Sequence, residues 1–174
     1  MHKLPSAGIL IFLAVLFIAS GQSVFAQEEA NVNEMAAGLG VEWNMNSREN
    51  FAGAVVFSYD YSLTPITFIE GGSYMLNFAA GINAAMSSNF SNTTVIETAA
   101  FFRWYFLGAG FRGPFAQGEL GFSHINEDDI SFESFMGGLR AGLRVPLGSF
   151  YIEPFGRFGY PYVFGIGAIA GIKF

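Results

Sequence analysis

Acidic and basic residues recur at alternate positions within apolar stretches of this sequence, a spacing that places them on one face of a β-strand. Five carboxylates and five bases follow this rule: Glu42, Asp60, Glu97, Arg103, Glu119, Arg140, Arg144, Glu153, Arg157 and Lys173. An isolated buried charge is costly and the two signs are equal in number, so the pattern predicts a network of ion pairs. The alternative is a line of charged groups that carries protons or ions.

A second set of residues has the types that hydrolytic catalysis uses: Ser123, His124, Glu127, Asp128, Asp129 and Ser131. Ser123 and His124 are neighbours in a predicted strand and would point to opposite faces, so they could react together only if the chain folded back. The acidic run also lacks the spaced oxygen ligands of a calcium-binding loop. We therefore expect no enzyme activity, no metal site and no cofactor, and we interpret the run as a solvated loop.

The elements that must position these side chains are strands, because apolar residues recur with a period of two. In residues 51–61 the odd positions are mostly apolar or aromatic, whereas the even positions include Ser58 and Asp60. Glu70 breaks the alternation, and a bulge at residues 71–72 is expected to restore it. Eight segments alternate in this way: residues 38–45, 51–61, 73–82, 94–106, 115–123, 134–145, 150–160 and 165–174.

Residues 1–26 have the features of a secretory signal peptide: a basic start, an apolar run over residues 9–19 and small residues before Gln27. The run is shorter than the ~20 residues of a membrane-spanning helix, so an N-terminal anchor is the less favoured alternative. Residues 27–174 then form one domain, which contains all 14 acidic residues of the chain and has no electrostatic reason to bind nucleic acid. No cysteine is present, so no disulfide holds the fold.

Eight alternating segments without a long apolar helix predict an all-β fold, an eight-stranded antiparallel up-and-down transmembrane β-barrel, which occupies residues 27–174. A soluble β-sandwich is the alternative, but the less apolar face is rich in glycine, alanine and aromatic residues. The connectors are expected to alternate between short (residues 62–65, 107–113 and 146–149) and mostly longer and polar (residues 44–50, 83–93 and 124–131). Short turns on one side and long loops on the other are typical of such barrels, and an even strand number leaves both termini on the short-turn, periplasmic side.

Aromatic residues gather near the predicted strand ends in two groups, as in the girdles of membrane barrels. One group consists of Tyr59, Tyr61, Trp104, Phe106, Phe150 and Phe174, and the other of Trp43, Phe51, Phe122, Phe135, Tyr160 and Phe164.

The interior of an eight-stranded barrel is just filled by its side chains, so the inward charges are expected to plug it. Glu153 is expected to lie at the centre of a cluster with Arg144 and Lys173, which neighbouring hairpins bring to its diagonal positions. Other inward residues could instead form an apolar ligand pocket: Phe101, Tyr105, Phe115, Met136, Tyr151 and Phe155. Pro154 faces outward within its segment and is expected to remove one hydrogen bond between strands.

The last segment alternates apolar residues up to a final phenylalanine: Ile166, Ala168, Ala170, Ile172 and Phe174. This pattern resembles the C-terminal signal by which bacterial outer-membrane barrels are recognised for insertion. The domain as a whole is similar to the small eight-stranded outer-membrane proteins of the OmpX, OmpA-barrel and OmpW group, and the resemblance is architectural.

The resemblance implies a monomer in the bacterial outer membrane, with membrane lipid and the barrel assembly machinery as partners. Two functions follow from it. The chain is expected to have a structural or surface-interaction role through its extracellular loops, with an extracellular ligand or a host surface as partner. The alternative is an OmpW-like conduit for small hydrophobic molecules.

Overall fold

The computed structural model describes residues 34–46, 51–63, 66–69, 73–89, 92–106, 112–127 and 130–174. The regular elements of these residues are strands: β1 (Met35–Met45), β2 (Phe51–Ser62), β3 (Ile66–Ile69), β4 (Ser73–Ser88), β5 (Thr93–Tyr105), β6 (Gly113–Glu127), β7 (Ile130–Leu147), β8 (Phe150–Tyr160) and β9 (Phe164–Lys173). Within them, no helix has the length and apolar character needed to cross a membrane. The predicted signal peptide lies outside the described residues.

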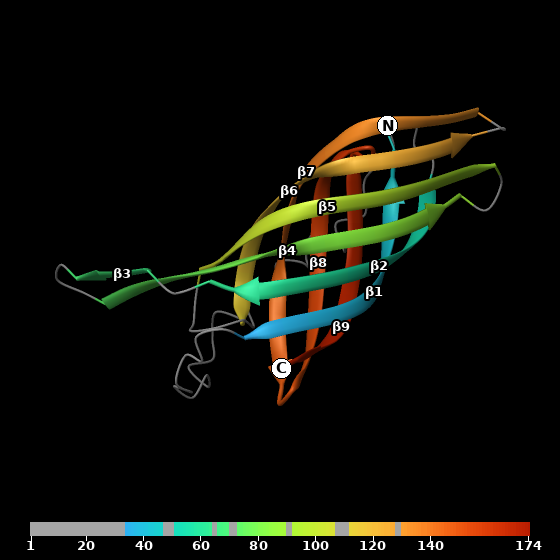
Figure 1. Cartoon of the computed structure of the whole chain (residues 1–174). Coiled ribbons are helices and arrows are strands. Elements are labelled where there is room, and N and C mark those ends of the chain that lie inside the picture. Colours follow the sequence, from blue (N-terminus) through green and yellow to red (C-terminus); the bar gives the residue numbers. More distant parts are fainter. Residues whose placement is uncertain are drawn as a thin grey trace, which may run out of the picture.

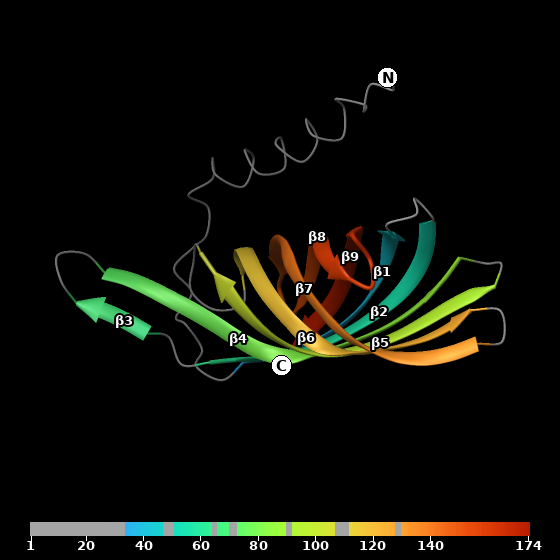
Figure 2. The same ribbon diagram turned by 90° about the horizontal axis from the view of Figure 1, so that it is seen from above.

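Eight of these strands close into an antiparallel barrel with up-and-down connectivity (Figure 1, Figure 2). The hydrogen-bonded order is β2–β1–β9–β8–β7–β6–β5–β4, and β4 pairs with β2 to complete the ring. The first and last strands meet with Trp43 opposite Ile166. The predicted fold class, an all-β protein with an eight-stranded up-and-down barrel, is confirmed.

The barrel has two ends, which we name by their connectors. The proximal end is the one where β1 begins and β9 ends, and it also holds the connectors after β2, β5 and β7. At the distal end, β1, β4, β6 and β8 end and the next strands of the ring begin.

β3 is a strand outside the ring, at the proximal end. It pairs with the first residues of β4, with Ile66 opposite Leu76, and the two segments form a hairpin that projects from the barrel (Figure 1). The expectation of a short turn after Ser62 is therefore wrong. Asn77 is the first residue of β4 that has a partner in β5. The residues of β4 before it pair with β3 instead, which satisfies backbone groups that would otherwise be left unpaired. The bulge predicted at residues 71–72 lies outside the described residues, as does Glu70.

The expected alternation of connector lengths is also wrong. β6 continues to Glu127 and β7 starts at Ile130, so the polar segment 124–131 is mostly strand. The stretch of sequence between β5 and β6, at the proximal end, is longer than any stretch between consecutive strands at the distal end. Polar residues do not end a strand when its backbone groups still find partners in the neighbouring strand. They extend the β6–β7 hairpin instead.

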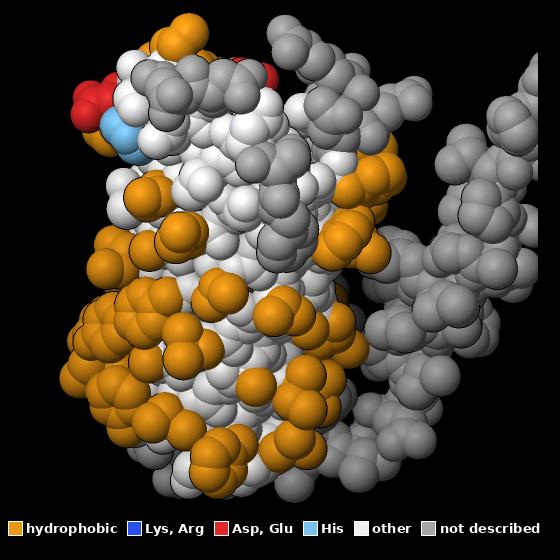
Figure 3. Space-filling model, turned by 90° about the vertical axis from the view of Figure 1, so that its right-hand side faces the viewer, with side chains coloured by type: hydrophobic (Ala, Val, Ile, Leu, Met, Phe, Trp, Pro, Cys, Tyr) orange, Lys and Arg blue, Asp and Glu red, His pale blue; other side chains and the backbone are white. Residues whose placement is uncertain are grey.

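Side chains alternate between the lumen and the outer wall along the barrel strands. In β5, every second residue from Val95 onward is buried and the residues between are exposed. The outer wall is apolar, with side chains more than half exposed at Leu39, Val41, Phe122, Leu139, Phe158 and Ile166. Figure 3 shows apolar side chains spread over this wall, with acidic and histidine side chains gathered at one end. A wall of this kind around a charged interior is the reverse of a water-soluble protein and suits hydrocarbon.

Aromatic pairs stand near both ends of the wall, in the two predicted groups. At the distal end, ring centroids lie 6.3 Å apart in Trp43–Phe51 and 6.0 Å apart in Phe122–Phe135. At the proximal end, Trp104 packs edge-on against Phe106 with centroids 4.5 Å apart.

Glycines on the inner face of β1 and β9 make room for an aromatic ring in the lumen. A Cβ atom added at Gly38 or at Gly171 would lie 2.5 Å from the Tyr151 hydroxyl oxygen. Tyr151 itself is buried. Close packing of this ring explains why the inner face of the last strand carries glycine rather than larger polar residues.

Candidate functional site

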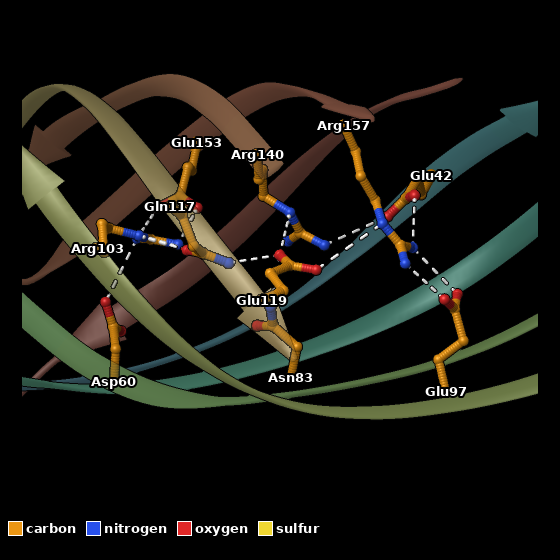
Figure 4. Close-up of polar contacts among 10 residues, drawn as sticks. All are labelled: Glu42, Asp60, Asn83, Glu97, Arg103, Gln117, Glu119, Arg140, Glu153 and Arg157. Carbon is orange, nitrogen blue, oxygen red and sulfur yellow. Dashed lines mark hydrogen bonds and ion pairs between the residues drawn. The ribbon is translucent and has the colours of Figure 1, made fainter. Parts of the chain in front are cut away.

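The lumen holds nine of the ten charged residues that the alternation assigns to one face, and Figure 4 shows most of them. Each is at most 3% exposed, and six strands supply them: Glu42 from β1, Asp60 from β2, Glu97 and Arg103 from β5, Glu119 from β6, Arg140 and Arg144 from β7, and Glu153 and Arg157 from β8. Lys173 differs from the expectation. It is partly exposed at the end of β9, and none of the ion pairs among the described residues includes it. At the rim of the barrel, its ammonium group can stay hydrated.

Asp60, Arg103, Arg144 and Glu153 form one cluster, which we call the Glu153 group. Arg103 donates to both carboxylate oxygens of Glu153, each at 2.9 Å, and Arg144 Nε donates to Glu153 Oε2 at 2.6 Å. Asp60 Oδ2 lies 3.4 Å from Arg103 Nη1 and 3.0 Å from Arg144 Nη1. Two carboxylates therefore face two guanidinium groups, and their formal charges cancel. Of the two partners expected for Glu153, Arg144 is in place, but Arg103 stands where Lys173 was expected.

Pro154 interrupts the β7–β8 ladder beside this group. The paired residues run from Gly137–Tyr160 to Gly142–Phe155 and resume at Val145–Ile152. Proline has no N–H to donate, which accounts for the gap. The Arg144–Glu153 ion pair joins the two strands within that gap, on the luminal side. A side-chain contact thus holds the strands together where the backbone pairing stops.

Glu42, Glu97, Glu119, Arg140 and Arg157 form a second cluster nearer the distal end, which we call the Glu42 group. Arg157 donates to both oxygens of Glu97, at 3.1 and 2.5 Å, and to Glu42 Oε1 at 3.3 Å. Arg140 Nε lies 3.0 Å from Glu119 Oε1, and Arg140 Nη2 lies 3.6 Å from Glu42 Oε2. Three carboxylates face two guanidinium groups here, so the formal charges leave one negative charge uncompensated.

Two amide side chains that the sequence analysis did not single out complete this network (Figure 4). Gln117 accepts from Arg103 Nε at 2.7 Å and donates to Glu119 Oε1 at 2.5 Å, which links the two groups. Asn83 Nδ2 donates to Glu119 Oε1 at 3.1 Å. Both amides occupy positions whose side chains face the lumen, so the period-two alternation in the sequence could have predicted them.

The six residues predicted to form an apolar pocket are all buried in the lumen: Phe101, Tyr105, Phe115, Met136, Tyr151 and Phe155. Three of the rings lie against a guanidinium group, with the carbon of Arg103 4.1 Å from the Phe115 centroid. The corresponding distances are 4.1 Å for Arg144 over Tyr151 and 4.2 Å for Arg140 over Phe155. Cation–π contacts of this kind are stronger when they are desolvated. These rings therefore cover the faces of the charged network and help to fill the barrel.

Tyr162 closes the distal mouth of the barrel, a role that the sequence analysis missed. It lies in the connector between β8 and β9, and its hydroxyl forms a hydrogen bond with Ser87 at the end of β4, on the opposite side of the ring. Its ring packs with Ala52, Val95 and Ile125. Burial raises the pKa of the Tyr162 hydroxyl above its ordinary value. Connectors have no periodicity, so no sequence signal pointed to this contact.

Replacing Tyr162 by phenylalanine is expected to lower the free energy of unfolding by about 1 to 2 kcal/mol, because the buried hydrogen bond to Ser87 is lost while the ring is kept. Val163→Ala is the matched control, since Val163 is an exposed residue of the same connector. Urea unfolding of the barrel in detergent micelles would measure both variants. Equal losses in the two would contradict the assigned role of Tyr162.

The residues considered for catalysis are separated in the structure. Ser123 is buried and its hydroxyl donates to the backbone oxygen of Ser134 at 3.4 Å, whereas His124 is exposed on the outer face of β6. Glu127 and Ser131 are exposed at the distal end, and Asp128 and Asp129 lie outside the described residues. No cluster of three or more acidic or histidine side chains in the described ranges is arranged to hold a metal ion. The absence of enzyme activity stays a prediction.

The segment interpreted as an insertion signal lies on the outer wall. Its residues are all exposed on β9 or directly after it: Ile166, Ala168, Ala170, Ile172 and Phe174. The backbone of Phe174 exchanges two hydrogen bonds of 2.9 Å with Met35 and so takes part in closing the ring. The role of these residues in insertion stays a prediction.

Comparisons with known proteins add one structural similarity. No protein-family model matches the chain, and no curated protein sequence matches it. Among solved structures, the chain is similar to the transport unit of the autotransporter AIDA-I from Escherichia coli, with a TM-score of 0.39 and 15% sequence identity. The match covers 84% of this chain and 58% of that chain, so this chain spans little more than half of its length. The fold assignment rests on the strand pairing described above, and the likeness to the OmpX, OmpA-barrel and OmpW group stays a resemblance.

Proposed function

We propose that this chain is an integral β-barrel protein of the bacterial outer membrane, with a structural or surface-interaction role and a closed lumen. The observation that carries the proposal is the reversed distribution of polarity, because buried ion pairs lie inside a wall of exposed apolar side chains. In hydrocarbon, every backbone polar group needs a partner within the protein, and a closed ring of strands provides it. Outer-membrane lipid and the barrel assembly machinery are then the expected partners of a monomer.

The filled lumen argues against general diffusion of solutes. An eight-stranded barrel has an interior just wide enough for side chains. Here the Glu153 group and the Glu42 group occupy it together with the buried rings, and Tyr162 covers the distal mouth. Function is therefore expected at the surface rather than through the interior.

The β6–β7 hairpin supports the distal end as the extracellular surface. It extends beyond the aromatic pair Phe122–Phe135 and exposes His124, Glu127 and Glu133. Polar strand extensions of this kind can meet water and an extracellular ligand or host surface. The proximal end, where β1 begins and β9 ends, would then face the periplasm. This orientation rests on the polar hairpin and not on connector length, because a longer connector lies at the proximal end.

Labelling of single cysteines on intact cells tests this proposal. The chain has no cysteine, so Ser131→Cys and Ser149→Cys each create one reactive thiol at an exposed serine. We expect a membrane-impermeant maleimide to label Ser131→Cys on intact cells and Ser149→Cys only after the outer membrane is opened. Labelling in the reverse order would overturn the orientation, and no labelling of either variant before lysis would contradict a surface-exposed protein.

A conduit for small hydrophobic molecules, which the resemblance to OmpW implies, is the second candidate. The interrupted β7–β8 ladder at Pro154 favours it, since that gap is a weak point in the wall. Passage would require the rings of Phe115, Tyr151 and Phe155 to leave their guanidinium partners. Uptake of an apolar fluorophore by proteoliposomes, above that of protein-free liposomes, would support the conduit over the closed barrel.

A further inference from the structure

The Glu42 group carries a negative charge that no described base balances. Its three carboxylates face Arg140 and Arg157, whereas the arginines of the Glu153 group are matched by two carboxylates of their own. Lys173 cannot supply the missing charge. It lies at the other end of β9 from Gly165, which is paired with Asn44 next to Glu42, and eight residues of strand correspond to about 26 Å.

Glu42 is the least well paired carboxylate of this group. Glu97 receives both arms of Arg157, and Glu119 receives donors from Asn83 and Gln117 in addition to its contact with Arg140. Glu42 Oε1 accepts one hydrogen bond of 3.3 Å, and Glu42 Oε2 has no hydrogen-bond partner among the described residues, with Arg140 Nη2 at a longer ion-pair distance of 3.6 Å. The uncompensated charge is therefore concentrated at Glu42.

Asn44 is an independent sign of a ligand beside this carboxylate. It follows Glu42 by two positions in β1, so both side chains point into the lumen. Asn44 is completely buried, yet neither its Oδ1 nor its Nδ2 has a hydrogen-bond partner in the described part of the chain. A buried amide without partners costs free energy, and few such groups occur in native proteins.

The oxygens of Glu42 and Asn44 both lie close to Gly165. A Cβ atom built at Gly165 would collide with Asn44 Oδ1 and would lie 2.8 Å from Glu42 Oε1. Glu42 Oε1, which also accepts from Arg157, and Asn44 Oδ1 therefore converge beside the backbone of Gly165, where no side chain could fit between them. The backbone N–H of Val163 donates to the oxygen of Met45 at 3.0 Å, so the connector that holds Tyr162 closes over the end of β1.

We propose that the barrel binds one alkali-metal cation between Glu42 and Asn44, over Gly165. A carboxylate and an amide oxygen are the kind of donors that hard cations prefer. One positive charge neutralises the Glu42 group, whereas a divalent ion would overcompensate it. The described residues also offer no cluster of three acidic or histidine ligands for such an ion. Water completes the coordination shell of the cation.

The test compares the thermal unfolding midpoint of the folded barrel in sodium chloride and in choline chloride, at equal ionic strength and at one pH. Choline is too large to reach the oxygens of Glu42 and Asn44. Replacing sodium by choline therefore keeps the electrostatic screening by salt but removes specific cation binding. Each tenfold rise in sodium above its dissociation constant is expected to raise the midpoint by about 3 to 6 °C. Potassium and lithium series at the same ionic strength would identify the preferred alkali ion.

Two variants locate the effect. Glu42→Gln neutralises the group and Asn44→Leu removes a ligand, and both are expected to make the midpoint equal in the two salts. Ser58→Ala is the control, because Ser58 is another buried residue whose hydroxyl lacks a partner among the described residues. It lies two positions from Asp60 of the Glu153 group on the same face of β2, so it should keep the full sodium effect. Sodium-23 NMR of the wild-type protein is a second measurement that needs no variant, and line broadening reversed by potassium is expected.

Equal midpoints of the wild-type protein in sodium and choline would overturn the proposal. A sodium effect that survives in both Glu42→Gln and Asn44→Leu would also overturn it, because binding would then lie elsewhere. If acidification alone stabilises the wild-type protein, without any preference among cations, a proton on Glu42 carries the charge and the metal site is wrong.

Discussion

Replacing Glu153 by glutamine is expected to lower the free energy of unfolding by about 3 to 5 kcal/mol. Glu153 accepts three hydrogen bonds from Arg103 and Arg144, and all three residues are buried. The substitution keeps the shape of the side chain but leaves two guanidinium groups facing Asp60 as their remaining carboxylate. One uncompensated positive charge in a low-dielectric interior accounts for the size of the loss. Urea unfolding in micelles, followed by loss of the heat-resistant folded form on gels, would measure it.

The double variant Glu153→Gln, Arg144→Met separates pairing from packing. Removing one base restores the balance of charge, so the double variant is expected to recover part of the stability lost in Glu153→Gln. Glu133→Gln is the matched control, because Glu133 is an exposed carboxylate on β7, and its loss should change the midpoint little. Additive losses from Glu153→Gln and Arg144→Met would show that the two side chains are not coupled.

Introducing valine at Gly38 is expected to cost about 3 kcal/mol or to prevent the barrel from closing. A Cβ atom at this position would lie 2.5 Å from the Tyr151 hydroxyl and 2.5 Å from Ile169 Cγ2, and both of those side chains are buried. Neither can move far, because the lumen is filled. The yield of folded barrel after refolding into micelles, together with its urea midpoint, would show the effect.

Gly118→Val is the control for this substitution. Gly118 faces outward on β6, and a Cβ atom there would meet no atom within 4 Å, so valine should be tolerated. Combining Gly38→Val with Tyr151→Phe removes one of the two colliding atoms and is expected to restore part of the folded yield. A Gly38→Val barrel as stable as the Gly118→Val barrel would contradict the close packing of β1 against Tyr151.

The sequence by itself determined the eight strands of the ring and which way their side chains face. Alternation with a period of two is a local property, since neighbouring residues of a strand always point to opposite sides. Glu42, Arg103 and Glu153 could therefore be assigned to one face before any strand was paired. The number of alternating segments, in the absence of a long apolar helix, was enough to predict the closed barrel.

Only the tertiary structure decided which acid meets which base. Arg103 on β5 reaches Glu153 on β8, and Arg157 on β8 reaches Glu97 on β5, although β6 and β7 separate these strands in the sheet. Such contacts cross the lumen and depend on the stagger of the strands around the ring. Reasoning from neighbouring hairpins therefore found Arg144 as a partner of Glu153 but chose Lys173 in place of Arg103.

The connectors were likewise decided by the tertiary structure. β3, the two-residue connector after β6 and the closure of the distal mouth by Tyr162 all lie where the sequence has no periodic pattern. Where strands stop depends on whether their backbone groups still find partners, and where Tyr162 packs depends on Ser87 across the ring. Periodicity reports the face on which a side chain lies, whereas contacts across a closed ring depend on distances that exist only after the ring has closed.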